Sequence, residues 1–150
     1  MFRLFRLTLL FLILQNTASS AEQVSWIKGQ WTGFRIVAPS QYPGAGEMRA
    51  RDFLKESVRI DAEKIVLPDQ SVCALQKPVK EVWQNDMYTF GSFGGDWADI
   101  GLYETTAGFQ VTTWAVDCAD DREHLNQLVG QPEQDVLLLD FGRVFTSLQR

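Results

Sequence analysis

Histidine and cysteine are scarce in this chain of 150 residues, which contains one histidine and two cysteines. The single histidine, His124, excludes a metal site built from several histidines and a catalytic triad that needs a second one. A Ser–His–Asp arrangement could be assembled around His124, but it lies among charged residues in a predicted helix, where exposed histidines are ordinary. We therefore expect no catalytic role for it.

Metal-binding and phosphate-binding motifs are also missing. The sequence GSFGG at residues 91–95 is not followed by the Lys and Ser or Thr of a phosphate-binding loop. A cluster of acids lacks the alternating spacing and the distal Glu of a calcium loop; it comprises Asp117, Asp120, Asp121 and Glu123. We interpret these acids as solvated, and the sequence predicts no metal and no cofactor.

Apolar runs long enough to cross a membrane are absent, since a spanning helix needs about 20 apolar residues. The short apolar run at residues 7–14 follows Arg3 and Arg6 and precedes small residues. This order is typical of a secretory signal peptide, with cleavage after Ser20 or Ala21. We therefore predict a signal peptide over residues 1–21, then one domain over 22–150 that is periplasmic or secreted, with no membrane span after cleavage.

The two cysteines, Cys73 and Cys118, are predicted to form one disulfide. An exported chain folds in an oxidising compartment, where two cysteines pair in the simplest case. Closing such a loop stabilises the folded state by about 4 kcal/mol in the chain-entropy account. A reactive thiol pair has little support, because the two residues lack a Cys-x-x-Cys spacing.

Charge is distributed unevenly along the chain. Residues 22–80 hold nine basic and seven acidic side chains, whereas residues 81–150 hold three basic and twelve acidic ones. An acidic protein is repelled by nucleic acid and by anionic membranes, so neither is an expected partner. The acids serve solubility and pairing between the two halves, or they form an acidic face for a basic partner.

Residues 108–118 (GFQVTTWAVDC) are the clearest strand in the sequence, rich in β-branched and aromatic residues. Alternation places Phe109 and Val111 on one face and Trp114 and Cys118 on the other. Further strands are expected from Gln30 onward, around residues 58–60 and 65–67, after Pro78, and over 135–141 and 143–149. These predict a mainly β fold, either a small antiparallel barrel or a strongly curved sheet.

Two helices are also predicted. Residues 47–56 carry a Glu47/Arg51 pair at i,i+4 spacing that suits a short helix, although an extended segment is also possible. Residues 119–130 combine early acids with Leu125, Leu128 and Val129 at helical spacing, and Gly130 would end that helix.

The first and last predicted strands resemble those of lipocalin-type barrels. Gly29-x-Trp31 is similar to the Gly-x-Trp that opens these barrels, and Arg150 stands where a basic side chain of the last strand can lie over that tryptophan. The resemblance covers the two ends of the chain only. It implies an up-and-down barrel around a ligand cavity, with Gly29, Trp31 and Arg150 as structural anchors.

Residues 88–101 (YTFGSFGGDWADIG) combine aromatic side chains with glycines. Because glycine impairs regular packing, strand periodicity does not account for all of these rings. Loops on a rigid scaffold often carry binding sites, although a mobile surface loop without function is the more ordinary outcome, and the rings could also fold back to plug one end of the barrel. The candidate ligand- or partner-binding residues are Tyr88, Phe90, Phe93, Asp96, Trp97 and Asp99.

Three classes of function stay open from sequence. Our first hypothesis is an exported, monomeric, non-enzymatic binding protein that holds a small apolar or amphipathic molecule or a basic exported protein. The second is an inhibitor of a cationic exported enzyme such as lysozyme, which rests on the acidic second half alone. The third is a small hydrolase that uses the loop carboxylates Asp96, Asp99 or Glu104.

Overall fold

The computed structural model describes residues 25–37, 45–85, 97–119, 125–142 and 144–150. The predicted signal peptide and the side chains of Tyr88, Phe90, Phe93, Asp96 and His124 lie outside these ranges.

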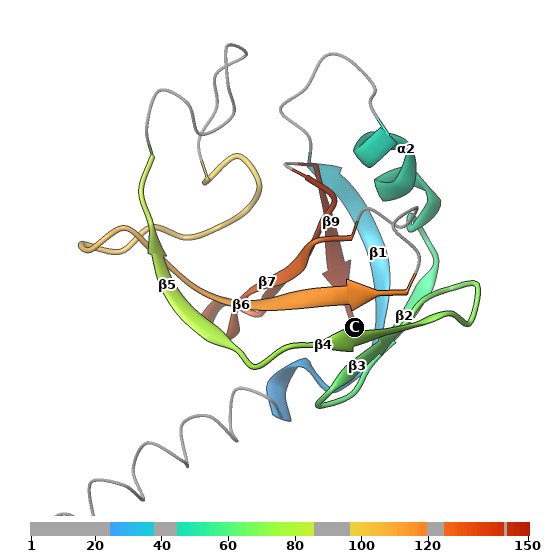
Figure 1. Ribbon diagram of the computed structural model, residues 1–150. Coiled ribbons are helices and arrows are strands. Elements are labelled where there is room, and N and C mark those ends of the chain that lie inside the picture. Colours follow the sequence, from blue (N-terminus) through green and yellow to red (C-terminus); the bar gives the residue numbers. More distant parts are fainter. Residues whose placement is uncertain (1–24, 38–44, 86–96, 120–124, 143) are drawn as a thin grey trace, which may run out of the picture.

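The described chain is mainly strand, as predicted (Figure 1). The strands are β1 (Gly29–Val37), β2 (Ser57–Ile60), β3 (Lys64–Val66), β4 (Val72–Leu75), β5 (Val79–Trp83), β6 (Phe109–Cys118), β7 (Gln127–Gln131), β8 (Val136–Asp140) and β9 (Phe145–Gln149). Helix α2 (Ala45–Asp52), a 3-10 helix η3 (Pro132–Gln134) and a helical turn at residues 25–27 complete the described elements.

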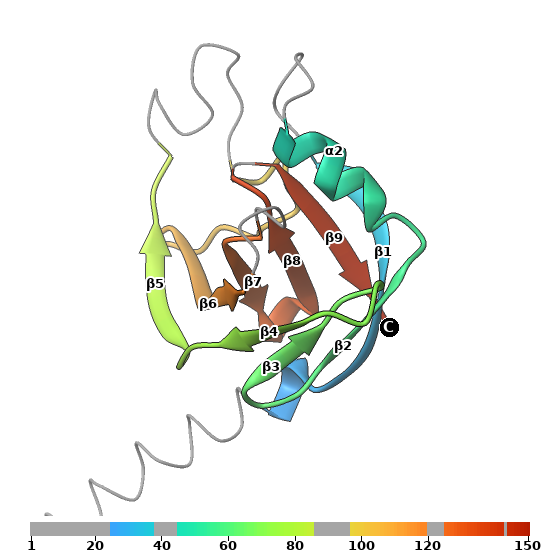
Figure 2. The same cartoon turned by 45° about the vertical axis from the view of Figure 1, so that its right-hand side comes forward.

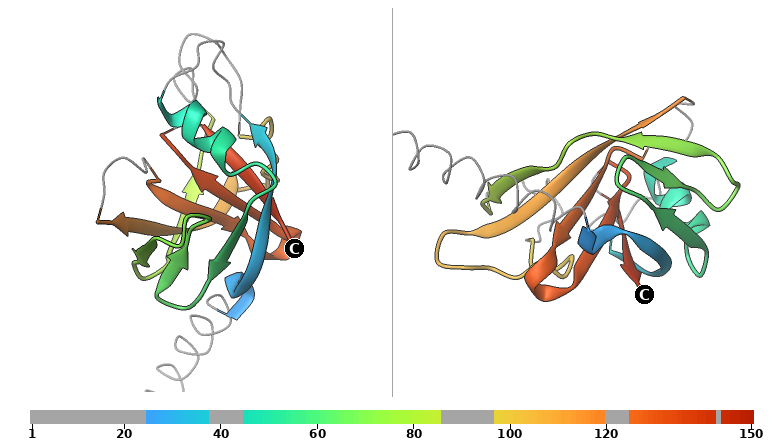
Figure 3. Two further views of the ribbon diagram at one scale, coloured as in Figure 1. Left: turned by 90° about the vertical axis from the view of Figure 1, so that its right-hand side faces the viewer. Right: turned by 90° about the horizontal axis from the view of Figure 1, so that it is seen from below.

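Eight of these strands close into an antiparallel barrel, which decides between the two predicted architectures (Figure 2). The hydrogen-bonded order runs β4-β3-β2-β1-β9-β8-β7-β6, and β4 pairs with β6 to close the ring. Strand β5 also pairs with β6 but stands outside the ring. The right-hand view of Figure 3 shows β5 and the start of β6 extending together beyond the barrel.

Strands β4 and β5 follow the same edge of β6 but are separated by a register shift. Leu75 lies opposite Val116, whereas Val79 lies opposite Thr113. The intervening segment contains Pro78, which has no backbone N–H to donate to a ladder. Beyond this shift β5 continues along β6, which is its only strand partner among the described residues.

The barrel interior is filled by a continuous apolar cluster. Trp31 and Trp114 are its largest members and are essentially inaccessible to solvent. Along the remaining strands, inward-facing residues alternate with outward-facing ones, as strand geometry requires. The inward-facing residues in this cluster include Val58, Ile60, Ile65, Cys73, Leu75, Leu128, Leu137, Leu139 and Leu148.

Both ends of the barrel are covered (Figure 3). At one end, Ile27 of the helical turn joins the interior cluster, and the indole Nε1 of Trp31 donates to the Ile27 carbonyl at 2.8 Å. At the other end, Ala50 of α2 and Phe53 join the same cluster. The hydroxyl of Thr146 on β9 donates to the Ala50 carbonyl at 3.0 Å, which fixes α2 over that opening.

A second apolar cluster lies on the opposite face of the same sheet. Its members are Val37, Ile100, Leu102, Phe109, Val111, Val129, Leu138 and Phe145, with Trp83, Trp97 and Val136 packed against them. We call this cluster the outer core. It confirms the sequence-derived alternation in β6, because Phe109 belongs to the outer core and Trp114 to the barrel interior.

The predicted disulfide is confirmed: Cys73 of β4 and Cys118 of β6 are bonded. The two residues lie directly opposite one another in the pairing that closes the ring, which comprises only three residue pairs. The bond therefore joins the first-half and second-half strands at the closure of the barrel.

Helix α2 confirms the predicted short helix, and Arg51 donates to Glu47 as the i,i+4 spacing suggested. The predicted helix over residues 119–130 is wrong where the structure describes it, because residues 127–131 form β7. Gly130 does not end a helix but makes room for two rings: a Cβ there would lie 2.8 Å from Trp26 and 3.1 Å from Trp114. Burial of both faces of β7 between β6 and β8 overrides the helical spacing of its leucines.

Candidate functional site

The barrel interior is the site that a cavity-binding function would use, and protein side chains occupy it. Trp31 and Trp114 cross the interior, and neither exposes more than 1% of its surface. The indole Nε1 of Trp114 has no hydrogen-bond partner in the described part of the chain. Side chains of the same cluster cover both barrel ends. Residues that could contact a partner therefore lie on the outer surface of the barrel.

Two of the predicted loop residues, Trp97 and Asp99, are described. Trp97 is half-buried and packs on the outer core, with its ring centroid 4.4 Å from that of Trp83 and 6.5 Å from that of Phe145. Its indole Nε1 donates to the Gln84 carbonyl at 3.1 Å. Asp99 is exposed. A binding role for the six loop residues stays a prediction, because the other four lie outside the described residues.

A buried amide fastens the segment after Trp97 to the sheet. Gln131 of β7 is 3% exposed; its Oε1 accepts from the Tyr103 backbone N–H at 2.7 Å. Its Nε2 donates to the carbonyls of Tyr103 and Gln110 at 2.9 and 3.0 Å. Three hydrogen bonds from this one side chain therefore connect β7 to the segment at Tyr103 and to β6 at Gln110.

Strand β5 is the margin of the sheet next to this tryptophan pair. It pairs with β6 alone among the described strands. All of its residues are exposed except Trp83, which is half-buried. Val79 and Val82 expose 54% and 51% of their surface. Glu81 is exposed and accepts a hydrogen bond of 2.8 Å from the Trp83 indole. The strand thus combines exposed apolar and charged side chains, and β6 is its only strand partner among the described residues.

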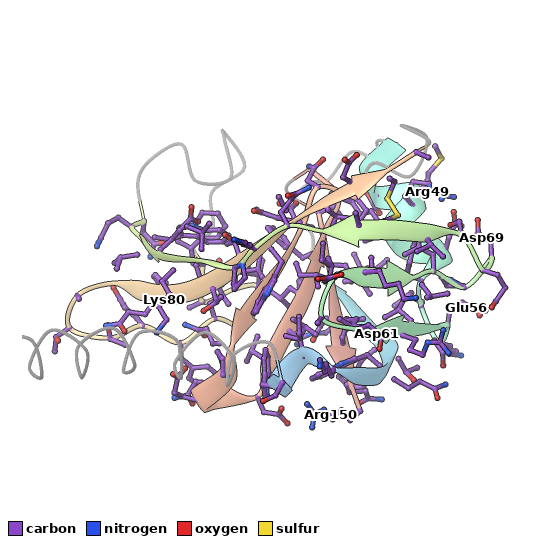
Figure 4. All side chains as sticks on the ribbon, turned by 60° about the horizontal axis from the view of Figure 1, so that its bottom comes forward. Arg49, Glu56, Asp61, Asp69, Lys80 and Arg150 are labelled. Atoms are coloured by element: carbon purple, nitrogen blue, oxygen red, sulfur yellow. A yellow bond between two sulfur atoms is a disulfide. The ribbon has the colours of Figure 1, made fainter. Side chains whose placement is uncertain are left out.

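A cleft of about 160 Å³ adjoins β5. Figure 4 shows Lys80 beside β5 and β6, on the part of the sheet that extends from the barrel. The cleft is lined by Lys80, Glu81, Val82, Gln110, Val111, Thr112, Pro132 and Glu133. Its size suits a single side chain of a partner better than a whole ligand.

The acids of the second half lie mostly on the surface. Those that are exposed in the described chain are Glu81, Asp99, Glu104, Asp117, Glu133 and Asp135, whereas Asp140 is buried. The buried carboxylate accepts from the Gln127 amide at 2.9 Å and from the Gly142 backbone N–H at 2.9 Å. The exposed acids spread over several elements, which suits solubility as well as attraction of a basic partner.

Sequence reasoning missed Trp83 and Gln131 as functional candidates. Trp83 carried a usable signal, because it lies in a predicted strand of alternating residues shortly before the aromatic loop. Gln131 carried none, since it lay just beyond the predicted helix over residues 119–130 and was assigned to no strand.

Within the described ranges, no group of three or more His, Cys, Asp or Glu side chains is arranged to hold a metal ion. No helix of the described residues is both long and apolar enough to cross a bilayer. Comparison with protein-family models, with curated proteins and with solved structures finds no match to this chain.

Proposed function

We propose that this chain is an exported, non-enzymatic binding protein that contacts a protein partner through β5 and the adjoining Trp83–Trp97 pair. The observation that carries the proposal is the exposure of two valines of β5, Val79 and Val82, next to the half-buried Trp83 and Trp97. Apolar side chains on a surface margin, next to aromatic anchors, are typical of protein interaction sites.

Export is supported by the charged start, short apolar run and small residues at positions 1–21, and by the disulfide. A lipocalin-like architecture is supported by Arg150, whose guanidinium lies 4.6 Å from the ring centroid of Trp31. Arg150 also donates to the Trp26 carbonyl. These contacts match the arrangement that the resemblance implied for the two ends of the chain.

A partner on the surface is favoured over a small molecule inside the barrel. The interior side chains are nearly inaccessible, and two tryptophans fill the centre. Admitting a ligand would require these side chains to move apart, at a cost set by the loss of close packing.

Site-specific photo-crosslinking tests the proposal. A photoreactive amino acid replaces Val82 in β5 or, as a matched control, Val72 in β4, which is exposed to 54% but lies in a strand paired on both sides. We expect one discrete protein adduct from the exported fraction at position 82 and none at position 72. Equal labelling at both positions contradicts the proposal, as does a small molecule retained by the native protein in mass spectrometry.

An inhibitor of a cationic exported enzyme is a second candidate, favoured by the exposed acids of the second half. Lysozyme is the probe: we expect inhibition that weakens as salt rises, because opposite charges are screened. An unchanged rate of cell-wall hydrolysis at low salt would eliminate this candidate.

A further inference from the structure

We draw no further inference here: the strongest candidate, the cleft of about 160 Å³ over β5, β6 and η3, carries none, because nothing in the structure shows what would cover it and Lys80 in its lining already has an interaction of its own.

Discussion

The barrel interior and the outer core are built on opposite faces of one sheet, yet different interactions enclose them. The interior is surrounded by strands that are hydrogen-bonded on both sides, and a disulfide lies at its closure. The outer core is covered by residues 97–103, held by Gln131 and the Trp83–Trp97 contact. Stability is therefore expected to concentrate in the barrel, while the outer core and β5 form the more adaptable part that suits binding.

The largest effect is expected from Trp31→Ala. Removing a fully buried indole from the barrel interior should lower the free energy of unfolding by about 3–5 kcal/mol. Denaturant titration measures the loss, with Phe34→Ala on the same strand as control, because Phe34 is exposed. A loss below about 1 kcal/mol would show that Trp31 does not anchor the barrel.

The second largest decrease in the free energy of unfolding is expected from loss of the disulfide. The double variant Cys73→Ala/Cys118→Ala should cost about 2–4 kcal/mol, because the unfolded chain regains the freedom that the cross-link removes. Thiol titration of the unreduced, denatured wild type should find no free thiol. Hydrogen exchange should rise first at the β4–β6 pairing, and exchange that rises first at β8 and β9 would contradict its closing role.

A smaller effect, about 1–3 kcal/mol, is expected from Gln131→Ala, which removes the partner of backbone groups of Tyr103 and Gln110. Hydrogen exchange should accelerate at residues 97–107 while β1, β2 and β9 stay protected. Gln134→Ala, at an exposed position nearby, is the matched control. Equal acceleration in the barrel would mean that the two cores unfold as one unit.

The smallest effect is expected at Asp69, in the turn between β3 and β4. Its carboxylate accepts from the hydroxyl and the backbone N–H of Ser71, which lowers the pKa of Asp69 below its ordinary value. A lowered folded-state pKa gives stability that is present above about pH 4 and lost as the pH falls through the folded-state value. Asp69→Asn should flatten the acid limb of the stability–pH curve slightly, and an unchanged curve would exclude this contribution.

The sequence by itself determined the features that depend on local pattern or on having few alternatives. Only two cysteines are present, so only one intramolecular pairing was possible. Alternation alone separated Phe109 from Trp114, because successive side chains of a strand point to opposite faces. The contact between Arg150 and Trp31 was expected from the residues at the two ends of the chain.

Only the tertiary structure decided the features that depend on neighbours distant in sequence. Leu125, Leu128 and Val129 fit a helix by spacing, and only burial between β6 and β8 makes residues 127–131 a strand. That β6 is the only strand partner of β5 among the described residues depends on how the ring closes, because β4 and not β5 joins β3 to β6. Trp83 meets Trp97 on the outer core, where the Trp97 indole donates to the Gln84 carbonyl, and such contacts form only once the whole sheet has assembled.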